Sequence, residues 1–133
     1  IKESKISKNI KILSYLDKVS LEIQYQNADI LLLPSLKTTK WEELFGISLI
    51  EAMSYGVIPI TTDHSGPLEV IQNNIDGYIY TEKNYIKSAY KVLNNFSCNP
   101  KIMIELKLNA IKKSKKFSIE KISKLWKNIT YEE

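Results

Sequence analysis

The sequence of 133 residues contains no arginine, one cysteine, one histidine, four glycines and four prolines. The single cysteine, Cys98, excludes an internal disulfide framework and a cysteine-based metal cluster. The lack of arginine argues against a nucleic-acid partner, because bidentate contacts to bases and phosphates favour guanidinium groups. No apolar run approaches the roughly 18 residues of a membrane span. The longest such run, 28–34, is interrupted by Asp29.

The composition that remains is that of a globular domain. Hydrophobic residues make up 44% of the chain and charged residues 26%, which argues against disorder. The length allows one domain with one hydrophobic core. No signal peptide is visible in the first residues. Because the chain opens on Ile1 rather than methionine, we expect the natural N-terminus to lie further upstream.

Positive charge is concentrated toward the C-terminus. Residues 101–133 carry 9 lysines and 4 acidic residues, whereas residues 1–100 carry 10 lysines and 11 acidic residues. Four of the C-terminal lysines lie close together: Lys112, Lys113, Lys115 and Lys116. A solvated helix face explains such a cluster, and contact with an anionic membrane is the alternative interpretation.

Short apolar runs alternate with longer periodic segments along the chain. Strands are predicted over residues 9–16, 28–34, 57–61 and 78–80. Helices are predicted over residues 20–27, 46–55, 67–72, 83–95, 100–116 and 118–129. This alternation predicts an α/β fold, with a Rossmann-like parallel sheet, flanking helices and a helical C-terminal end. Ligands bind beyond the carboxyl ends of such strands, so we expect the chemistry in the loops 35–45 and 62–66.

Two glutamates lie on either side of a predicted helix start. Glu43 precedes the start at Gly46, and Glu51 lies about 7–8 Å further along the helix at 1.5 Å per residue. The first N–H groups of a helix, here at Gly46, Ile47 and Ser48, suit phosphate oxygens. Carboxylates on both sides of a phosphate suit the hydroxyls of ribose and of a sugar. Two glutamates at this spacing also occur on ordinary surface helices.

The residues around this pair form a longer pattern of short motifs. In chain order they are Pro34-Ser35, Glu43, Phe45-Gly46, Glu51-Ala52-Met53, Gly56, Pro59, Gly66, Glu69-Val70-Ile71 and Asp76-Gly77. This pattern resembles the donor-binding half of GT-B fold retaining glycosyltransferases (glycosyl transferases group 1, family 4-like). The resemblance covers residues 9–80 closely and the helical remainder loosely.

The resemblance implies a role for each candidate site residue. Glu43, as the catalytic residue, contacts hydroxyls of the transferred sugar, and Glu51 binds the ribose. Backbone N–H groups face the diphosphate and the sugar; they belong to Phe45, Gly46, Ile47, Ser48 and Leu49. The base lies beside Ser14 to Leu16, so Leu16 is also a donor-binding residue. The 65–66 turn flanks the site.

The sequence departs from the family pattern in several places. Ser14 stands where the family usually has glycine, and Ser65-Gly66-Pro67 stands where many members have two glycines. The family's first strand of this domain, its glycine-rich turn, its basic diphosphate clamp and its acceptor-binding N-terminal domain have no counterpart here. We therefore expect residues 1–133 to be a partial C-terminal nucleotide-sugar-binding domain of a longer enzyme, inactive by itself.

The implied function is transfer of a sugar, of hexosyltransferase type, from a nucleotide-sugar donor to an acceptor hydroxyl with retention of configuration. Glycan, polysaccharide or glycolipid synthesis is the implied setting, with a glycan or lipid-linked acceptor. We expect no cofactor beyond the donor, and no metal, because there is no Asp-x-Asp motif and His64 is the only histidine. A cytoplasmic location is expected, with peripheral membrane contact through the basic C-terminal helices. A non-catalytic nucleotide-sugar-binding fragment and a nucleotide-sugar epimerase of related fold are the alternatives.

Overall fold

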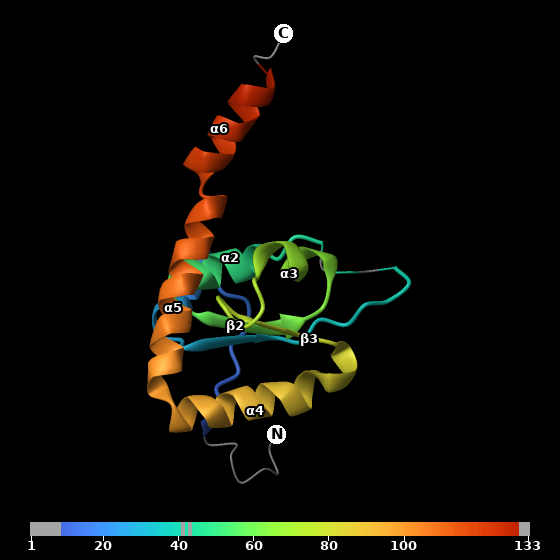
Figure 1. Ribbon diagram of the computed structural model, residues 1–133, viewed down its shortest axis with the longest axis vertical. Coiled ribbons are helices and arrows are strands. Elements are labelled where there is room, and N and C mark those ends of the chain that lie inside the picture. The colour runs from blue at the N-terminus through green and yellow to red at the C-terminus, as the bar shows by residue number, and fades with distance from the viewer. Residues whose placement is uncertain (1–8, 41, 43, 131–133) are drawn as a thin grey trace.

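The computed structural model of this chain describes residues 9–40, 42 and 44–130. Three parallel strands form one sheet in the order β1-β2-β3, and helices cover both of its faces (Figure 1). The strands are β1 (Ile30–Leu33), β2 (Ile58–Thr62) and β3 (Tyr78–Tyr80). The helices are α1 (Lys18–Gln26), α2 (Ile47–Ser54), α3 (Ser65–Val70), η2 (Glu82–Asn84), α4 (Tyr85–Cys98), α5 (Pro100–Ser114), η3 (Lys115–Phe117) and α6 (Ile119–Thr130). The expected α/β class with a parallel sheet is confirmed.

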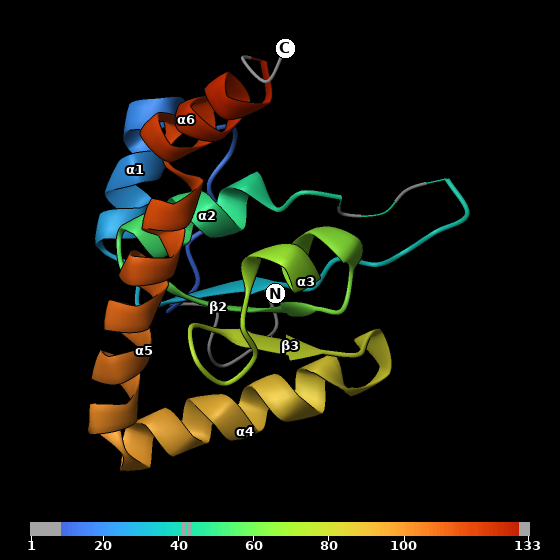
Figure 2. The same cartoon turned by 45° about the horizontal axis from the view of Figure 1, so that its top comes forward.

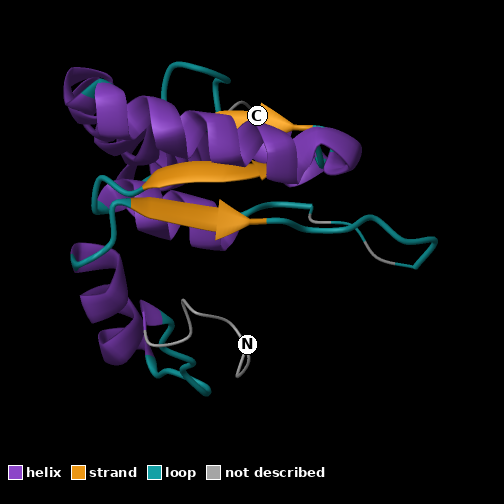
Figure 3. Ribbon diagram, turned by 90° about the horizontal axis from the view of Figure 1, so that it is seen from below, coloured by secondary structure: helices purple, strands orange, loops and turns teal. Residues whose placement is uncertain are grey.

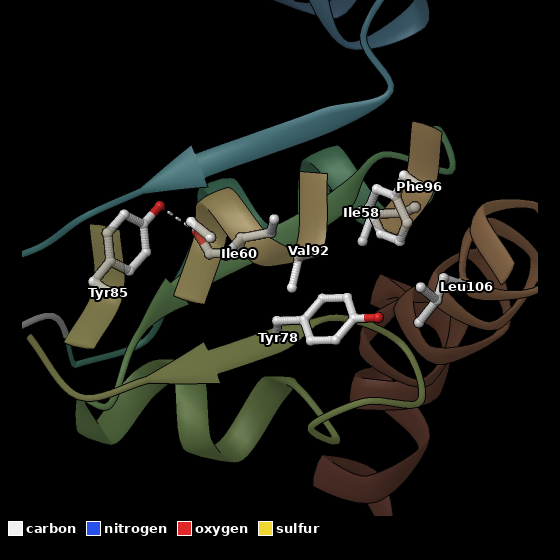
Figure 4. Packing of buried hydrophobic residues seen from close by; sticks show 8 residues of the cluster. Ile58, Ile60, Tyr78, Tyr85, Val92, Phe96 and Leu106 are labelled. Carbon is white, nitrogen blue, oxygen red and sulfur yellow. Dashed lines mark hydrogen bonds between the residues drawn. The ribbon is translucent and has the colours of Figure 1, made fainter. Parts of the chain in front are cut away.

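One face of the sheet packs against α4. Side chains alternate between the two faces of a strand, so Ile58 and Ile60 of β2 point to the same face as Tyr78 of β3 (Figure 4). They form a buried cluster with α4 and α5 residues: Tyr85, Ala89, Val92, Phe96 and Leu106. The hydroxyl of Tyr85 donates a hydrogen bond to the carbonyl oxygen of Ile60 at 2.9 Å. The apolar residues of the helix predicted over 83–95 therefore belong to the core.

The other face of the sheet packs against α2, α3 and α5. Leu31 and Leu33 of β1 and Ile79 of β3 contact a cluster that includes the fully buried Leu49 and Met53 of α2. Every residue of β2 is buried, because this strand has a neighbouring strand on each side and helices over both faces.

The prediction of a strand over residues 9–16 is wrong. This segment has no strand, and its apolar side chains before Leu16 are exposed, with Ile12 at 77% and Tyr15 at 95%. A strand needs a hydrogen-bonding partner, and β2 is the only partner of β1 among the described residues. Asp17 ends this segment by accepting a hydrogen bond from the backbone N–H of Ser20 at 2.7 Å, so α1 begins at Lys18.

The C-terminal helices agree with the predicted ranges to within about three residues. Past η3, helix α6 extends away from the sheet (Figures 1 and 2). Its apolar residues Ile119, Leu125 and Trp126 are exposed. Within the described residues, no helix combines the length and apolarity that crossing a bilayer requires.

Candidate functional site at the carboxyl edge of the sheet

The three strands point the same way, so the segments that follow them gather at one edge of the sheet. The long loop after β1 runs out beyond this edge before it returns to α2 (Figure 3). The segment after β2 enters α3 at Ser65, and the segment after β3 enters η2 at Glu82. Helices α2 and α3 therefore begin at the edge where parallel α/β sheets bind ligands.

The start of α2 depends on a glycine. Gly46 is the N-cap residue and has a left-handed backbone with φ +68°, which other residues adopt at a cost. A Cβ atom at this position would also lie 2.8 Å from Cδ1 of Leu49. The carbonyl oxygen of Gly46 accepts the backbone N–H of Leu49 at 2.9 Å. The glycine lets the chain turn sharply into the helix while Leu49 fills the core.

The structure places four of the other predicted donor-binding residues at this turn. Phe45 and Ile47 are exposed at 55% and 61%, Ser48 is half-buried, and the side chain of Leu49 is fully buried. Leu16 is half-buried and lies two residues before α1. Glu43 lies outside the described residues, so its predicted position relative to Glu51 stays a prediction.

Glu51 lines a pocket of about 180 Å³ between α1 and α2. Lys18, Tyr25 and Tyr55 are also on its walls, and the rings of the two tyrosines stack with centroids 6.1 Å apart. Burial raises the pKa of the Tyr25 hydroxyl, and the negative charge of Glu51 raises it further. An exposed carboxylate therefore stands beside an aromatic wall, about one and a half helical turns from the start of α2.

A carboxylate outside the set of predicted site residues connects the loop after β1 to α3. Glu42 accepts two hydrogen bonds from Ser65 through Oε1, from the backbone N–H at 3.1 Å and from the hydroxyl at 2.8 Å. Its Oε2 pairs with Nζ of Lys37 at 2.5 Å. These contacts, with the Lys37 bond the strongest, lower the pKa of Glu42 to about 2. The group is therefore ionised at neutral pH.

A second carboxylate holds the first part of the same loop. Oε1 of Glu82 accepts the backbone N–H of Lys37 at 2.7 Å and lies 3.0 Å from Nε2 of His64. His64 is 1% exposed. The Lys37 bond, followed by the His64 bond, lowers the pKa of Glu82. His64 is thus a buried link between α3 and η2.

The start of α3 also lies directly against the loop. A Cβ atom on Gly66 would be 2.4 Å from the backbone nitrogen of Phe45 and 2.6 Å from the backbone carbon of Leu44. Only glycine permits so close an approach of two backbones. The predicted 65–66 turn is the first turn of α3, and the structure places it beside Phe45 and the start of α2.

Sequence spacing does not indicate these contacts, because the partners are far apart in the chain. Glu42 and Ser65 are 23 residues apart, and Lys37 and Glu82 are 45 residues apart. The one available signal was position, since Lys37 and Glu42 both fall in the loop at which the sequence predicted chemistry.

A second, basic pocket lies at the opposite edge of the sheet, next to the turn that leads into β3. It has a volume of about 170 Å³ and is lined by Asp76 and by Lys112, Lys113 and Lys116 of the C-terminal cluster. Burial raises the pKa of Asp76, although a hydrogen bond from the backbone N–H of Gln72 and the charges of Lys113 and Lys116 oppose the rise. Nowhere in the described ranges do three or more His, Cys, Asp or Glu side chains gather as metal ligands.

The chain is similar to curated glycosyltransferases over part of their length. It is 31% identical over 74 residues to the amylovoran biosynthesis glycosyltransferase AmsK of Erwinia amylovora, which covers 55% of this chain and 18% of that protein. It is 50% identical over 36 residues to a sucrose synthase of Nitrosomonas europaea, which covers 27% of this chain and 4% of that protein. The matched stretches thus span less than a fifth of these relatives.

The fold is similar to that of a solved structure. The C-terminal domain of LpcC, a glycosyl transferase group 1 family protein from Francisella tularensis, superposes with a TM-score of 0.67 at 24% identity. The similarity covers 81% of this chain and 53% of the other. This likeness shows the GT-B type of C-terminal fold.

The family model described as "Glycosyl transferases group 1" matches residues 1–117, which is most of the chain. The motifs of residues 34–77 and the parallel sheet agree with this match. The chain belongs to the group 1 family of glycosyl transferases.

Proposed function

We propose that this chain is the donor-binding part of a longer glycosyltransferase that moves a sugar from a nucleotide-sugar donor to an acceptor hydroxyl with retention of configuration. The observation that carries the proposal is the arrangement at α2. Its amide-rich start faces the carboxyl edge of the sheet, next to the first turn of α3, and Glu51 stands in a pocket further along the same helix.

The backbone N–H groups of Ile47 and Ser48 bind the diphosphate in this proposal. Helix starts carry partial positive charge, and their first amides have no partner within the helix. The cap residue Gly46 has no side chain that could occupy them. Leu49 has its N–H engaged with Gly46 and its side chain in the core, so it holds the start of the helix in place.

Glu51 binds the ribose and the base lies beside Leu16. The pocket at Glu51 is about 180 Å³, below the roughly 300 Å³ at which whole-ligand sites begin. It therefore suits one ring of the donor, with the remainder of the molecule running toward the start of α2. A carboxylate accepts hydrogen bonds from a ribose diol strongly.

Glu43 positions the sugar during transfer. Charge develops on the departing diphosphate, and preorganised amides at a helix start stabilise it. A carboxylate beside the sugar hydroxyls keeps the reacting carbon in line with the acceptor. The acceptor is a glycan or lipid-linked hydroxyl held by a preceding domain, and the name of the relative from Erwinia amylovora supports a role in polysaccharide synthesis.

The test is a pair of substitutions in the full-length enzyme. Glu43→Gln is expected to abolish sugar transfer, and Glu51→Ala is expected to weaken binding of the nucleoside diphosphate by about tenfold or more with an unchanged melting temperature. Glu105→Gln on the exposed side of α5 is the matched control and is expected to change neither. Equal affinity of Glu51→Ala and the unmodified enzyme in calorimetry rejects the ribose role.

The reaction products separate this function from its alternatives. A transferase yields a glycosylated acceptor of retained configuration and a free nucleoside diphosphate. Release of an epimerised nucleotide sugar with no change in acceptor identifies an epimerase. Binding of the donor without turnover in the full-length protein identifies a non-catalytic module.

A further inference from the structure

Described residues of the loop between β1 and α2 are joined to the rest of the protein by polar contacts. The loop spans residues 34–46 between Leu33 and Ile47 and extends beyond the sheet (Figure 3). Its described residues form no helix or strand, and loops of this length are uncommon in compact domains unless they serve a function. The loop sequence contains two lysines and two glutamates: Lys37, Lys40, Glu42 and Glu43.

Glu42 holds the far end of this loop through three charge-assisted contacts. Both oxygens are used, Oε1 by the two donors of Ser65 and Oε2 by the ammonium of Lys37. Hydrogen bonds to a carboxylate are roughly twice as strong as those between neutral groups. The contact with Ser65 fixes the loop to the first turn of α3, at the point where Gly66 allows the backbone of Phe45 to approach.

Lys37 joins this contact to a second one. Its ammonium pairs with Glu42, while its backbone N–H donates to Glu82 at 2.7 Å. The same oxygen of Glu82 lies 3.0 Å from Nε2 of the buried His64. His64 directly precedes Ser65, so the two carboxylates hold the loop to the same turn from two directions.

We propose that Glu42 and Lys37 are positioning residues that hold the backbone of Leu44 to Gly46, and with it the start of α2, in the geometry that receives the donor. This inference rests on the proposed function for its consequence in binding. Its structural half, the ordering of the loop by the pair, stands separately. Neither residue needs to touch the donor, because each acts through the loop that both hold.

The substitution Glu42→Gln tests the arrangement at the level of single atoms. A glutamine offers one acceptor oxygen and one NH₂ group. It can therefore accept from Ser65 or from Lys37 but not from both, and the other position becomes a contact between two donors. Amide hydrogen exchange at residues 44–48 and at Ser65 in the full-length enzyme is expected to accelerate by at least tenfold.

Matched variants in the same loop separate positioning from general disruption. Lys37→Met is expected to accelerate exchange as Glu42→Gln does. Lys37→Arg is expected to keep the slow exchange of the unmodified enzyme, since arginine keeps the pair with Glu42. Lys40→Met, three residues further along the loop, is the control and is expected to leave exchange unchanged. The double variant Lys37→Met with Glu42→Gln is expected to exchange no faster than the faster of the two single variants, because the two residues form one unit.

Donor binding gives the functional half of the test. With UDP, GDP and ADP as probes, the nucleotide that the unmodified enzyme binds is expected to bind Glu42→Gln tenfold to a hundredfold more weakly, since a misplacement on the order of 1 Å has effects of this size. The melting temperature is expected to change by only a few degrees.

Each result assigns success or failure to one claim. Unchanged exchange in Glu42→Gln overturns the positioning role, whatever the nucleotide affinity. Faster exchange with undiminished affinity overturns the link from the loop to the donor. If the unmodified enzyme binds none of the three nucleotides, the proposed function fails, while the exchange measurement still decides whether the pair orders the loop.

Discussion

Strand β2 and the loop after β1 meet where the hydroxyl of Thr62 donates to the carbonyl oxygen of Ser35 at 2.8 Å. They are held in different ways. Every residue of β2 is buried, and Ile58 and Ile60 are completely enclosed. The loop instead exposes Leu36 at 63% and depends on polar contacts. Apolar burial stabilises the sheet whatever the charge of nearby groups. The loop, in contrast, depends on the negative charge of Glu42.

The largest expected effect is on the sheet. Ile60→Ala removes buried methyl groups from the cluster under α4 and is expected to lower the free energy of unfolding by about 3 kcal/mol. Denaturant unfolding of the protein measures the change. Ile86 lies on α4 and is 83% exposed. Ile86→Ala is therefore expected to change the free energy of unfolding by no more than about 0.5 kcal/mol. Equal effects of the two substitutions would show that the cluster contributes little.

The next effect is at the boundary of the two regions. Gly66→Ala places a methyl group 2.4 Å from the backbone nitrogen of Phe45, so the loop or α3 must move. We expect a loss of about 2 kcal/mol in the free energy of unfolding, typical of overpacking. We also expect faster hydrogen exchange in residues 44–48. A variant with unchanged exchange and stability would mean that the two backbones are further apart than the structure places them.

A smaller effect concerns one polar contact inside the apolar region. Tyr85→Phe removes the hydroxyl that donates to the carbonyl of Ile60 and is expected to cost about 1 kcal/mol. Tyr90→Phe is the matched control, because Tyr90 is 66% exposed on α4. The difference between the two variants in denaturant unfolding gives the contribution of the buried bond. Equal free energies of unfolding for the two variants would show that this hydrogen bond does not stabilise the fold.

The smallest effect is on the response to pH. The pKa of Glu42 is lowered from 4.5 to about 2, so its ionised form favours the folded state. This contribution is complete above about pH 4.5 and is lost as the pH falls toward 2. The melting temperature of the unmodified protein minus that of Glu42→Gln is therefore expected to shrink over this range. A difference that stays constant from pH 6 to pH 2 would contradict the ion pair with Lys37.

The sequence was sufficient to predict the strands at 28–34, 57–61 and 78–80, since runs of buried apolar residues have few other uses. It failed at 9–16, where an apolar alternation without a neighbouring strand remains exposed. The spacing of apolar residues in a sequence shows which side chains a strand or helix could bury. Whether a partner is beside it is a property of the assembled chain.

The same division applies to the site. The sequence by itself determined the helix start at Gly46 and the placement of Glu51 along α2, because both follow from local geometry and from the 1.5 Å rise of a helix. Only the tertiary structure brought Glu42 to Ser65 and Glu82 to Lys37 and His64. These contacts join residues 18 to 45 positions apart. No local preference encodes them, since they exist only when three parallel strands place their carboxyl ends at one edge.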